Sequence, residues 1–458
     1  MYQHEKGSTM KTAKISRRHF LATTSTGAVA ALASSHLPAA DVLSKKGGQL
    51  AVAGGTPVRT KGWPGWPVWD RSAEDEILEV LRSGNWYRGQ GTRVTEFEKR
   101  YAELLGAKSC LATASGTTAL MTALHVLGVE AGDEVIVSPY TFVASYNVIY
   151  SAKALPVFAD TDPETFTINP ARIEERITER TRAILPVHIL GLPVAMDPIM
   201  DIAKKHNLVV VEDACQAWLA EYKGQKCGLI GNLGCFSFQN SKHLPAGEGG
   251  AVVGNDEAVV DRCHSFHNCG RSHGSFRPAG SNPVRGTNFR MQEFQAVILM
   301  SQMKRLEKDT KLRGENADYL SARLKQIPGI IPHKPNPGAT RAVYHLYPFR
   351  YEKDRFNGAS RDKFLAALTA EGVPCSGGYG PANKDGSIEE ALSSTSYKRL
   401  FSKERLDRYR QENVLPQNDQ LCREAVWFTQ NMLLGSRQDM DDIADAVEKI
   451  YANREKLV

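Results

Sequence analysis

The sequence has no run of apolar residues that approaches the ~20 needed to cross a bilayer as a helix, so it offers no candidate membrane span. It also lacks a large excess of charge over most of its length. Residues 1–46 carry seven positive and two negative charges, so they hold +5 of the total net charge of +6. Without a strongly basic remainder, the sequence gives no electrostatic argument for binding nucleic acid.

Cysteine is sparse, and its spacing excludes the common disulfide and redox motifs. The chain has eight cysteines in 458 residues, and none forms a C-x-x-C pair. Several lie in apolar runs, where cysteine acts as a small hydrophobic residue, and a disulfide framework is not expected at this density. The cluster Cys263, His264, His267, Cys269 and His273 matches no standard zinc spacing, so we expect no metal site.

The N-terminal residues have the order of an export signal. Ser16-Arg17-Arg18-His19-Phe20-Leu21 is followed by a small and apolar stretch, and alanines that suit cleavage are Ala33, Ala39 and Ala40. This order predicts a leader over residues 1–40 that resembles a twin-arginine signal, which exports folded proteins. The expected destination is the periplasm. If the leader instead remained as an uncleaved tail, the protein would stay in the cytoplasm.

The rest of the chain reads as a large α/β protein. Hydrophobic and charged contents of 42% and 24% are ordinary for a globular enzyme. Residues 41–70 form a linker and an arm in which Trp63-Pro-Gly-Trp-Pro-Val-Trp69 packs across the domain surface. Helices are predicted over residues 71–83, ending at Gly84, and over residues 94–105.

Strand and helix patterns then alternate, which is typical of a parallel sheet covered by helices. In open sheets of this kind, ligands bind at the carboxyl ends of the strands. The loops that follow the strands are therefore the places to search for a site. Seven strands are predicted, over residues 109–113, 134–137, 155–159, 183–187, 208–212, 234–238 and 250–254.

The loop after the first predicted strand suits a phosphate. Ala114-Ser115-Gly116-Thr117-Thr118 opens a helix that extends to about Leu127. Free N–H groups at a helix start, a glycine and two threonine hydroxyls form a cradle for an anion. The same residues are also ordinary helix-capping groups, so this motif alone leaves both interpretations open.

Two further loops carry groups that suit a flat, cationic ring. Pro139-Tyr140-Thr141-Phe142 offers an aromatic face, although an aromatic residue more often packs in the core. Glu212-Asp213-Ala214-Cys215-Gln216 ends an apolar strand with acidic residues. Because an unpaired buried charge is costly, such a carboxylate needs a cationic partner, and a protonated pyridine nitrogen would be one.

Lys242 lies in a polar loop between two short apolar runs, residues 234–238 and 249–254. A lysine at a strand end can lose solvation and fall in pKa, as a Schiff-base amine requires. By itself it would equally be one of many solvated surface lysines. Together with the Ser237 hydroxyl, the cradle, the aromatic ring and the carboxylate, however, it completes the set of groups that a pyridoxal phosphate site needs.

At these residues the chain resembles the DegT/DnrJ/StrS-type aminotransferases, pyridoxal-phosphate enzymes of the fold-type-I superfamily. The resemblance covers residues 54–452, and within the family it looks like the branch with L-glutamine:scyllo-inosose aminotransferases and 3-amino-5-hydroxybenzoate synthases. It implies an α/β large domain, residues 71–311, with a seven-stranded mostly parallel sheet, and a smaller C-terminal α+β domain, residues 312–458. The segments that carry it are ASGTTAL, SPYTFVAS, VEDACQA, SFQNSK, GEGG and GTNFRM followed by Gln295-Ala296.

The resemblance also assigns roles to individual residues. Lys242 would hold the cofactor and then shuttle the proton, and Asp213 would keep the pyridine nitrogen protonated. Asn288 would reach the phosphate of a neighbouring subunit, which implies a homodimer with shared active sites. The other cofactor contacts would be Gly116, Thr117 and Ser237 at the phosphate, Phe142 stacked on the ring and Gln216 near its phenolic oxygen.

The sequence therefore predicts a pyridoxal-phosphate aminotransferase that passes an amino group from glutamate or glutamine to a ketosugar or ketocyclitol. Some relatives carry histidine instead of the lysine and act as dehydratases, so Lys242 favours transamination. The alternatives are a pyridoxal-phosphate lyase or isomerase on the same scaffold, and an exported non-catalytic cofactor- or sugar-binding protein. The export leader departs from the relatives, which work in the cytoplasm.

Overall fold

The computed structural model describes residues 48–280 and 282–457, so the predicted leader lies outside the described residues. Lys45–Val458 forms one compact unit. Within the described residues, no helix has both the length and the apolar character that crossing a membrane requires.

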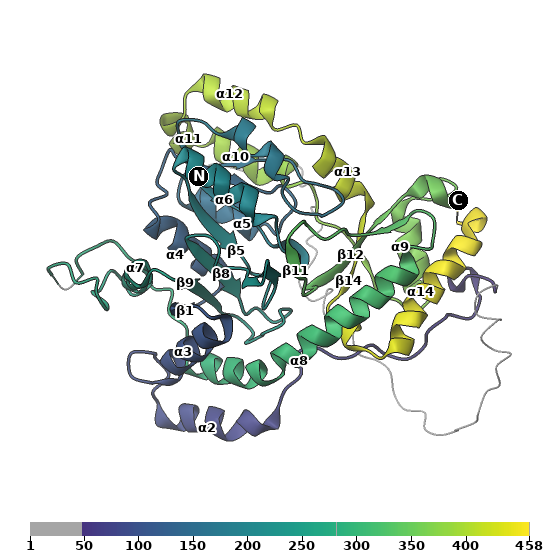
Figure 1. Cartoon of the computed structure of the whole chain (residues 1–458), viewed down its shortest axis with the longest axis horizontal. Coiled ribbons are helices and arrows are strands. Elements are labelled where there is room, and N and C mark those ends of the chain that lie inside the picture. The colour runs from purple at the N-terminus through teal and green to yellow at the C-terminus, as the bar shows by residue number, and fades with distance from the viewer. Residues whose placement is uncertain (1–47, 281, 458) are drawn as a thin grey trace, which may run out of the picture. The chain divides into compact units, whose positions relative to one another are not determined.

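A seven-stranded sheet forms the centre of the larger part of this unit, as the sequence predicts (Figure 1). The strand order is β1-β9-β8-β5-β4-β2-β3, and β9 alone runs antiparallel to its neighbours. The strands are β1 (Ser109–Thr113), β2 (Glu134–Val137), β3 (Leu155–Phe158), β4 (Thr181–Leu185), β5 (Val209–Asp213), β8 (Leu233–Ser237) and β9 (Gly250–Gly254).

The predicted strands agree with the observed ones to within two residues at each end. The largest shift is in β4, which begins at Thr181 rather than at residue 183. Thr181 and Arg182 are polar and partly or fully exposed, but the backbone already pairs at Thr181, opposite Glu134 of β2. Hydrophobicity alone cannot detect such a polar strand start.

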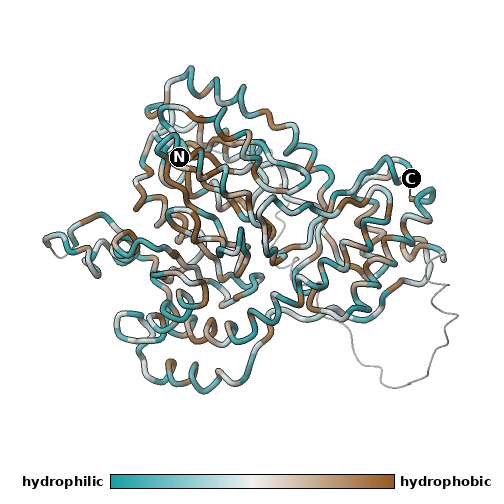
Figure 2. Tube along the Cα trace, viewed as in Figure 1, coloured by the Kyte–Doolittle hydropathy of each residue, from teal (hydrophilic) through white to brown (hydrophobic). Residues whose placement is uncertain are grey.

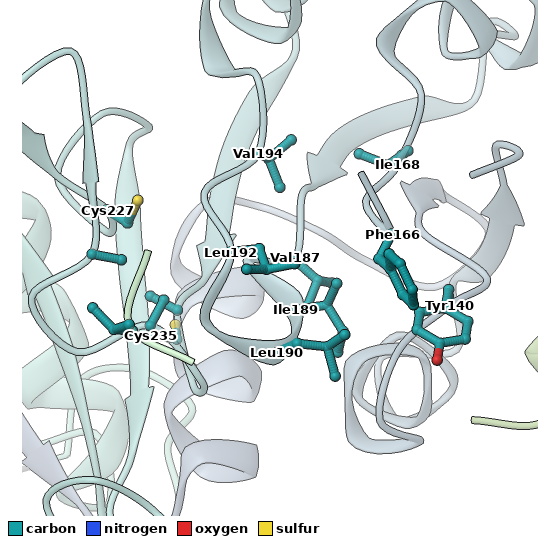
Figure 3. Close-up of a cluster of buried hydrophobic side chains, with 14 of the residues drawn as sticks. Tyr140, Phe166, Ile168, Val187, Ile189, Leu190, Leu192, Val194, Cys227 and Cys235 are labelled. Atoms are coloured by element: carbon teal, nitrogen blue, oxygen red, sulfur yellow. The ribbon is translucent and has the colours of Figure 1, made fainter. Parts of the chain in front are cut away.

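Helices pack around this sheet and bury its apolar residues. Figure 2 shows hydrophobic residues concentrated along the central strands and hydrophilic residues along the outer helix α12. Figure 3 shows part of the core, where Tyr140 and Phe166 lie together beside the loop that carries Ile189 and Leu190. The helices of this part are α2 (Glu74–Ser83), α3 (Arg93–Leu105), α4 (Gly116–Val126), α5 (Ala144–Ser151), α6 (Met196–His206) and α7 (Glu257–His267).

The smaller part is built on a four-stranded antiparallel sheet of order β10-β12-β14-β13. The helix α8 (Glu293–Leu324) runs from the central sheet to this second sheet (Figure 1). The remaining elements of the smaller part are β10 (Ile330–Pro332), β12 (Leu346–Tyr351), α9 (Arg361–Ala370), β13 (Ser376–Gly377), β14 (Ala425–Thr429) and α14 (Arg437–Ala452). A three-stranded sheet joins β11 (Ala339–Arg341) to β6 (Glu221–Tyr222) and β7 (Gln225–Lys226).

The division of the chain at residue 311 stays a prediction, and two features of the structure bear on it. The helix α8 is continuous across this position. The later helices α10 (Gly386–Ser393), α11 (Thr395–Leu400), α12 (Lys403–Glu412) and α13 (Pro416–Glu424) begin beside the central sheet. There, the hydroxyls of Tyr397 and Tyr409 donate to the carbonyls of Ala154 and Pro156 at 2.6 and 2.9 Å.

An N-terminal latch ties the start of the described chain to the smaller part. The latch consists of the buried Glu371–Lys449 ion pair and residues 51–58, which bind to it. Oε2 of Glu371 lies 2.8 Å from Nζ of Lys449. The Glu371 carboxylate accepts the N–H groups of Ala51 and Val58 at 2.8 and 3.0 Å. Lys449 donates to the carbonyl of Thr56 at 2.8 Å. Both charges are thus compensated, as burial requires.

The first acidic residue at the end of β5 does not face the candidate site. The Glu212 carboxylate is fully buried and contacts His188 Nε2 at 2.9 Å. It also accepts the backbone N–H groups of Gly228, Ile230 and Gly231 at 2.6 to 2.7 Å. Glu212 therefore holds the loop that leads into β8, and of the Glu212-Asp213 pair only Asp213 is available to a ligand.

Glu212→Gln should lower the free energy of unfolding by about 3–5 kcal/mol, the usual cost of breaking a buried charged network. The glutamine amide cannot accept hydrogen bonds from all of these N–H groups, because its NH2 group is itself a donor and would face backbone N–H donors. Urea unfolding of the cofactor-free protein measures the change. Glu79→Gln on an exposed side chain is the matched control and should change stability by less than about 0.5 kcal/mol. Equal effects of the two substitutions would contradict this role.

Candidate active site

A pocket of about 920 Å³ opens at the carboxyl ends of the central strands, where the smaller part meets the large sheet. It has the size of a cofactor or small-molecule site. Seven of the eight predicted site residues line it, which are Gly116, Thr117, Phe142, Asp213, Gln216, Ser237 and Lys242. The eighth, Asn288, is exposed and lies outside the lining of this pocket.

Lys242 is held in a closed loop between β8 and β9. Its backbone N–H donates to the carbonyl of Gln239 at 2.9 Å, and the Trp66 indole N–H donates to its carbonyl at 3.1 Å. The Nζ atom lies 3.4 Å from Nε2 of His345. Burial lowers the pKa of Lys242, and nearby Cys215 and Asp213 oppose this only in part. A lowered pKa is what a Schiff-base amine requires, and the role of Lys242 stays a prediction.

Asp213 is a buried carboxylate whose position is fixed by two donors. The Ser145 hydroxyl donates to Oδ2 at 2.7 Å, and the N–H of Cys215 donates to Oδ1 at 3.1 Å. Ser145 is itself in contact with the Thr141 hydroxyl at 2.8 Å. No cationic side chain of the described residues lies within 4.0 Å of this carboxylate. Asp213 is thus ready to pair with a positively charged group of a ligand.

Gln216 links the loop after β5 to the smaller part. Its Oε1 accepts the N–H of Leu190 at 2.8 Å, and its Nε2 donates to the Tyr379 hydroxyl at 3.0 Å. Tyr379 also packs edge-on against Tyr140 and Trp427. The side-chain amide of Gln216 is therefore already oriented by protein groups on both its oxygen and its nitrogen.

At the start of α4, where the sequence predicts a phosphate cradle, one of the two threonine hydroxyls caps the helix instead. Ser115 and Thr118 make a capping box, in which each side chain bonds the other residue's backbone N–H. The capping interpretation is thus correct for these two residues, and the prediction that both threonine hydroxyls serve the cradle is wrong for Thr118. The N–H groups of Gly116 and Thr117 have no acceptor within the helix and remain for an anion.

Gly116→Ala should weaken cofactor binding by about 10- to 100-fold. A methyl group at this position would lie 2.7 Å from Cβ of Ser237 and 2.8 Å from Sγ of Cys215, and overpacking costs about 1–3 kcal/mol. Titration of the cofactor-free protein with pyridoxal phosphate measures the affinity. Gly386→Ala is the control, because Gly386 also opens a helix but has open space around it. Unchanged affinity in Gly116→Ala would remove this assignment.

Phe142 has an exposed ring at the mouth of the pocket, with 53% of its surface accessible. It is therefore not a core aromatic, and its stacking on the cofactor ring stays a prediction. Asn288 lies in an exposed segment and pairs with Asn268 of the same chain. Its predicted role toward a neighbouring subunit stays a prediction.

Several pocket residues are absent from the sequence-based assignment. Trp66 comes from the N-terminal arm, which lines the pocket as well as packing across the surface, while His345, Trp427 and Gln430 come from the smaller part. Tyr379, which bonds Gln216, also lines the pocket. The run of aromatic residues in the arm was the one sequence feature that could have indicated Trp66. Nothing in the local sequence shows which distant segments line the pocket.

The histidine and cysteine cluster at the end of α7 forms no metal site. Within residues 48–280 and 282–457, no three His, Cys, Asp or Glu side chains come together as metal ligands. His264 and His273 stack on each other with ring centroids 3.9 Å apart. His267 contacts Arg88 at 3.3 Å, and Arg88 is paired with the buried Glu98. The cluster is therefore a packed structural element.

Comparison with known proteins agrees with this geometry. Residues 68–428 match the sequence pattern of the DegT/DnrJ/EryC1/StrS aminotransferase family. The chain is 36% identical over 426 residues to an L-glutamine:2-deoxy-scyllo-inosose aminotransferase of Streptoalloteichus tenebrarius, and the match covers 89% of this chain and 99% of that protein.

Solved structures show the same fold. A 3-amino-5-hydroxybenzoic acid synthase superposes with a TM-score of 0.73 at 29% identity, covering 85% of this chain and 99% of the other. An aminotransferase from Psychrobacter cryohalolentis superposes with a TM-score of 0.74 at 31% identity, covering 86% and 100%. The fold is therefore that of the fold-type-I aminotransferases, as predicted.

Proposed function

This chain belongs to the DegT/DnrJ/EryC1/StrS aminotransferase family, and on that basis we propose that it transfers the amino group of L-glutamine or L-glutamate to a ketocyclitol or ketosugar. The observation that carries the proposal is the half-buried Lys242, with its lowered pKa, in one pocket with the buried Asp213. The similarity to a scyllo-inosose aminotransferase supports a cyclic polyhydroxylated ketone as acceptor.

The pocket fits pyridoxal phosphate, the cofactor of this family's aminotransferases. The helix start at Gly116 and Thr117 provides N–H donors for a phosphate, with the Ser237 hydroxyl beside them. Among the described residues no cation lies within 4.0 Å of the Asp213 carboxylate, and a protonated pyridine nitrogen would supply one. When bound, pyridoxal phosphate supplies an electron sink that stabilises a carbanion on the amino-acid carbon.

Lys242 and its neighbours are suited to moving the proton between substrate carbon and nitrogen. Because burial lowers its pKa, the Lys242 amine is more easily obtained uncharged, and only an uncharged amine can accept a proton. His345 lies 3.4 Å from this amine, and burial also holds the pKa of His345 well below its usual range. A neutral imidazole here accepts or donates a hydrogen bond without opposing the proton transfer.

We also propose a homodimer in which Asn288 serves the pocket of the second subunit. In a single chain, Asn288 is exposed and lies outside its own pocket, two residues before Arg290, which pairs with Thr113 of β1. Sedimentation of the purified protein tests the oligomeric state. Mixing Asn288→Ala and Lys242→Ala chains would then restore about a quarter of full activity in a shared-site dimer and none in independent subunits.

An absorbance spectrum tests the main proposal. The protein loaded with pyridoxal phosphate should show a visible band that disappears when L-glutamine or L-glutamate is added and returns when a ketocyclitol is added. Recovery of the band only with the ketone would also separate transamination from lyase or isomerase chemistry, since those reactions need no amino acceptor. A protein that stays colourless with added cofactor would refute the proposal.

A further inference from the structure

Arg313 is a fully buried guanidinium that lacks a carboxylate partner. It lies on α8 with 0% of its surface accessible, and its Nε donates to Oε1 of Gln430 at 2.8 Å. Neither Nη1 nor Nη2 has a hydrogen-bond partner among the described residues, and none of their carboxylates lies within 4.0 Å. Asp309, one turn earlier on the helix, is occupied by Nε of Arg305 at 2.6 Å.

The charge of Arg313 is kept in spite of its burial. Burial lowers the pKa of Arg313 to about 9, which is still above neutral pH. A buried charge without a hydrogen-bonded carboxylate is costly and is usually paired in proteins. The Trp66 ring, with its centroid 5.2 Å from Cζ of Arg313, offsets this cost only in part. The electrostatic effect of Arg313 reaches the pocket, because it contributes to the lowered pKa of His345, which lines the pocket beside Lys242.

Arg313 determines which end of the Gln430 amide faces the ligand. Gln430 follows β14, is 3% exposed and lines the pocket. Because a guanidinium N–H can only donate, the amide atom beside Arg313 must be the oxygen. The NH2 group of Gln430 has no protein acceptor among the described residues, so it is left with two donors for a group in the pocket.

We propose that Gln430, oriented by Arg313, binds the carboxylate of the amino-acid donor, an inference that rests on the proposed aminotransferase function. A carboxylate satisfies the NH2 donors and also compensates the unpaired guanidinium charge, whereas a neutral hydroxyl or ketone oxygen would satisfy only the donors. The phosphate of the cofactor is not the group concerned, since its cradle is at α4 and Gln430 belongs to the smaller part.

Gln430→Glu is the decisive variant, because it keeps the shape of the side chain and replaces the donors by a negative charge. The ligands are glutaramate, which is glutamine without its amino group, and the uncharged glutaramide. Calorimetric titration of the cofactor-loaded protein gives both dissociation constants. Glutaramate should bind Gln430→Glu at least about tenfold more weakly than wild type, and glutaramide within about twofold.

Two further measurements separate recognition from damage to the fold. The new carboxylate pairs with Arg313, so the thermal midpoint of Gln430→Glu should stay or rise. If this variant fails to fold, Arg313→Lys carries the test, because it removes the Nε donor that orients Gln430 and should lose part of the same preference. Gln326→Glu, an exposed position near the end of α8, is the control and should leave both affinities unchanged.

Equal weakening of both ligands, or no change in either, would overturn the inference. Failure of this inference can be told apart from failure of the proposed function. If wild-type protein shows no loss of its visible band with L-glutamine, the aminotransferase proposal fails, whereas the glutaramate preference measures the Arg313–Gln430 pair without turnover.

Discussion

Lys242→Ala should abolish the visible absorbance of the lysine-linked cofactor and reduce turnover by about four orders of magnitude or more, the scale of loss when a covalent nucleophile is removed. Alanine leaves the loop intact, because its contacts with Gln239 and Trp66 use the Lys242 backbone. Spectra of the loaded protein and rates with L-glutamine measure the two effects. The visible absorbance band and the turnover should disappear together.

Lys334→Ala is the matched control for this experiment. Lys334 has an exposed side chain that pairs with Glu164 on the surface, and it does not line the pocket. Its removal should leave the spectrum and the rate unchanged. A Lys242→Ala protein that still turned over would refute the assignment of Lys242, and residual binding of the cofactor without turnover would show that the phosphate cradle holds it alone.

Asp213→Asn should leave the cofactor bound and slow turnover by about 10³-fold. The amide keeps the size of the side chain and can still accept from Ser145 or Cys215, so the local structure is preserved. It has no negative charge, however, and cannot hold a proton on the nitrogen opposite. Losses of this size are known when a buried charge that supports a catalytic group is neutralised. Rapid mixing with L-glutamine measures the rate of absorbance loss.

Ser145→Ala tests whether the effect comes from the carboxylate or from its surroundings. It removes the 2.7 Å hydrogen bond to Asp213 but keeps the charge, so the rate should fall by about tenfold only. If Asp213→Asn retained the wild-type rate, Asp213 would have no part in the reaction. Equal losses in the two variants would instead assign the effect to the position of the carboxylate.

The sequence predicted the central sheet and most of its loops because both depend on local patterns. The strands are short apolar runs between turns, and parallel strands bring their carboxyl ends to one edge, which places Gly116, Asp213 and Lys242 together. The start of α4 was ambiguous, because its residues suit helix capping as well as phosphate binding. Whether Thr118 serves the helix or the ligand depends on side-chain rotamers, which a sequence pattern does not determine.

The residues from distant segments could not be predicted in this way. Trp66, His345 and Gln430 reach the pocket only because the arm, α8 and the second sheet pack against the central sheet. Arg313 lies within a 32-residue helix that carries many exposed charges, and nothing in its sequence neighbourhood marks it as buried. Long-range packing also explains why residues 386–418 lie beside the central sheet, a position that chain order does not indicate.

The N-terminal latch bears on how the protein is processed. Its contacts begin at Ala51, so the folded part retains them whether a leader is cut after Ala33, Ala39 or Ala40. The Asn453 side chain also donates to the carbonyl of Gly48 at 3.2 Å, still downstream of every such site. Cleavage at any of these alanines would therefore leave both sets of anchors in the mature chain.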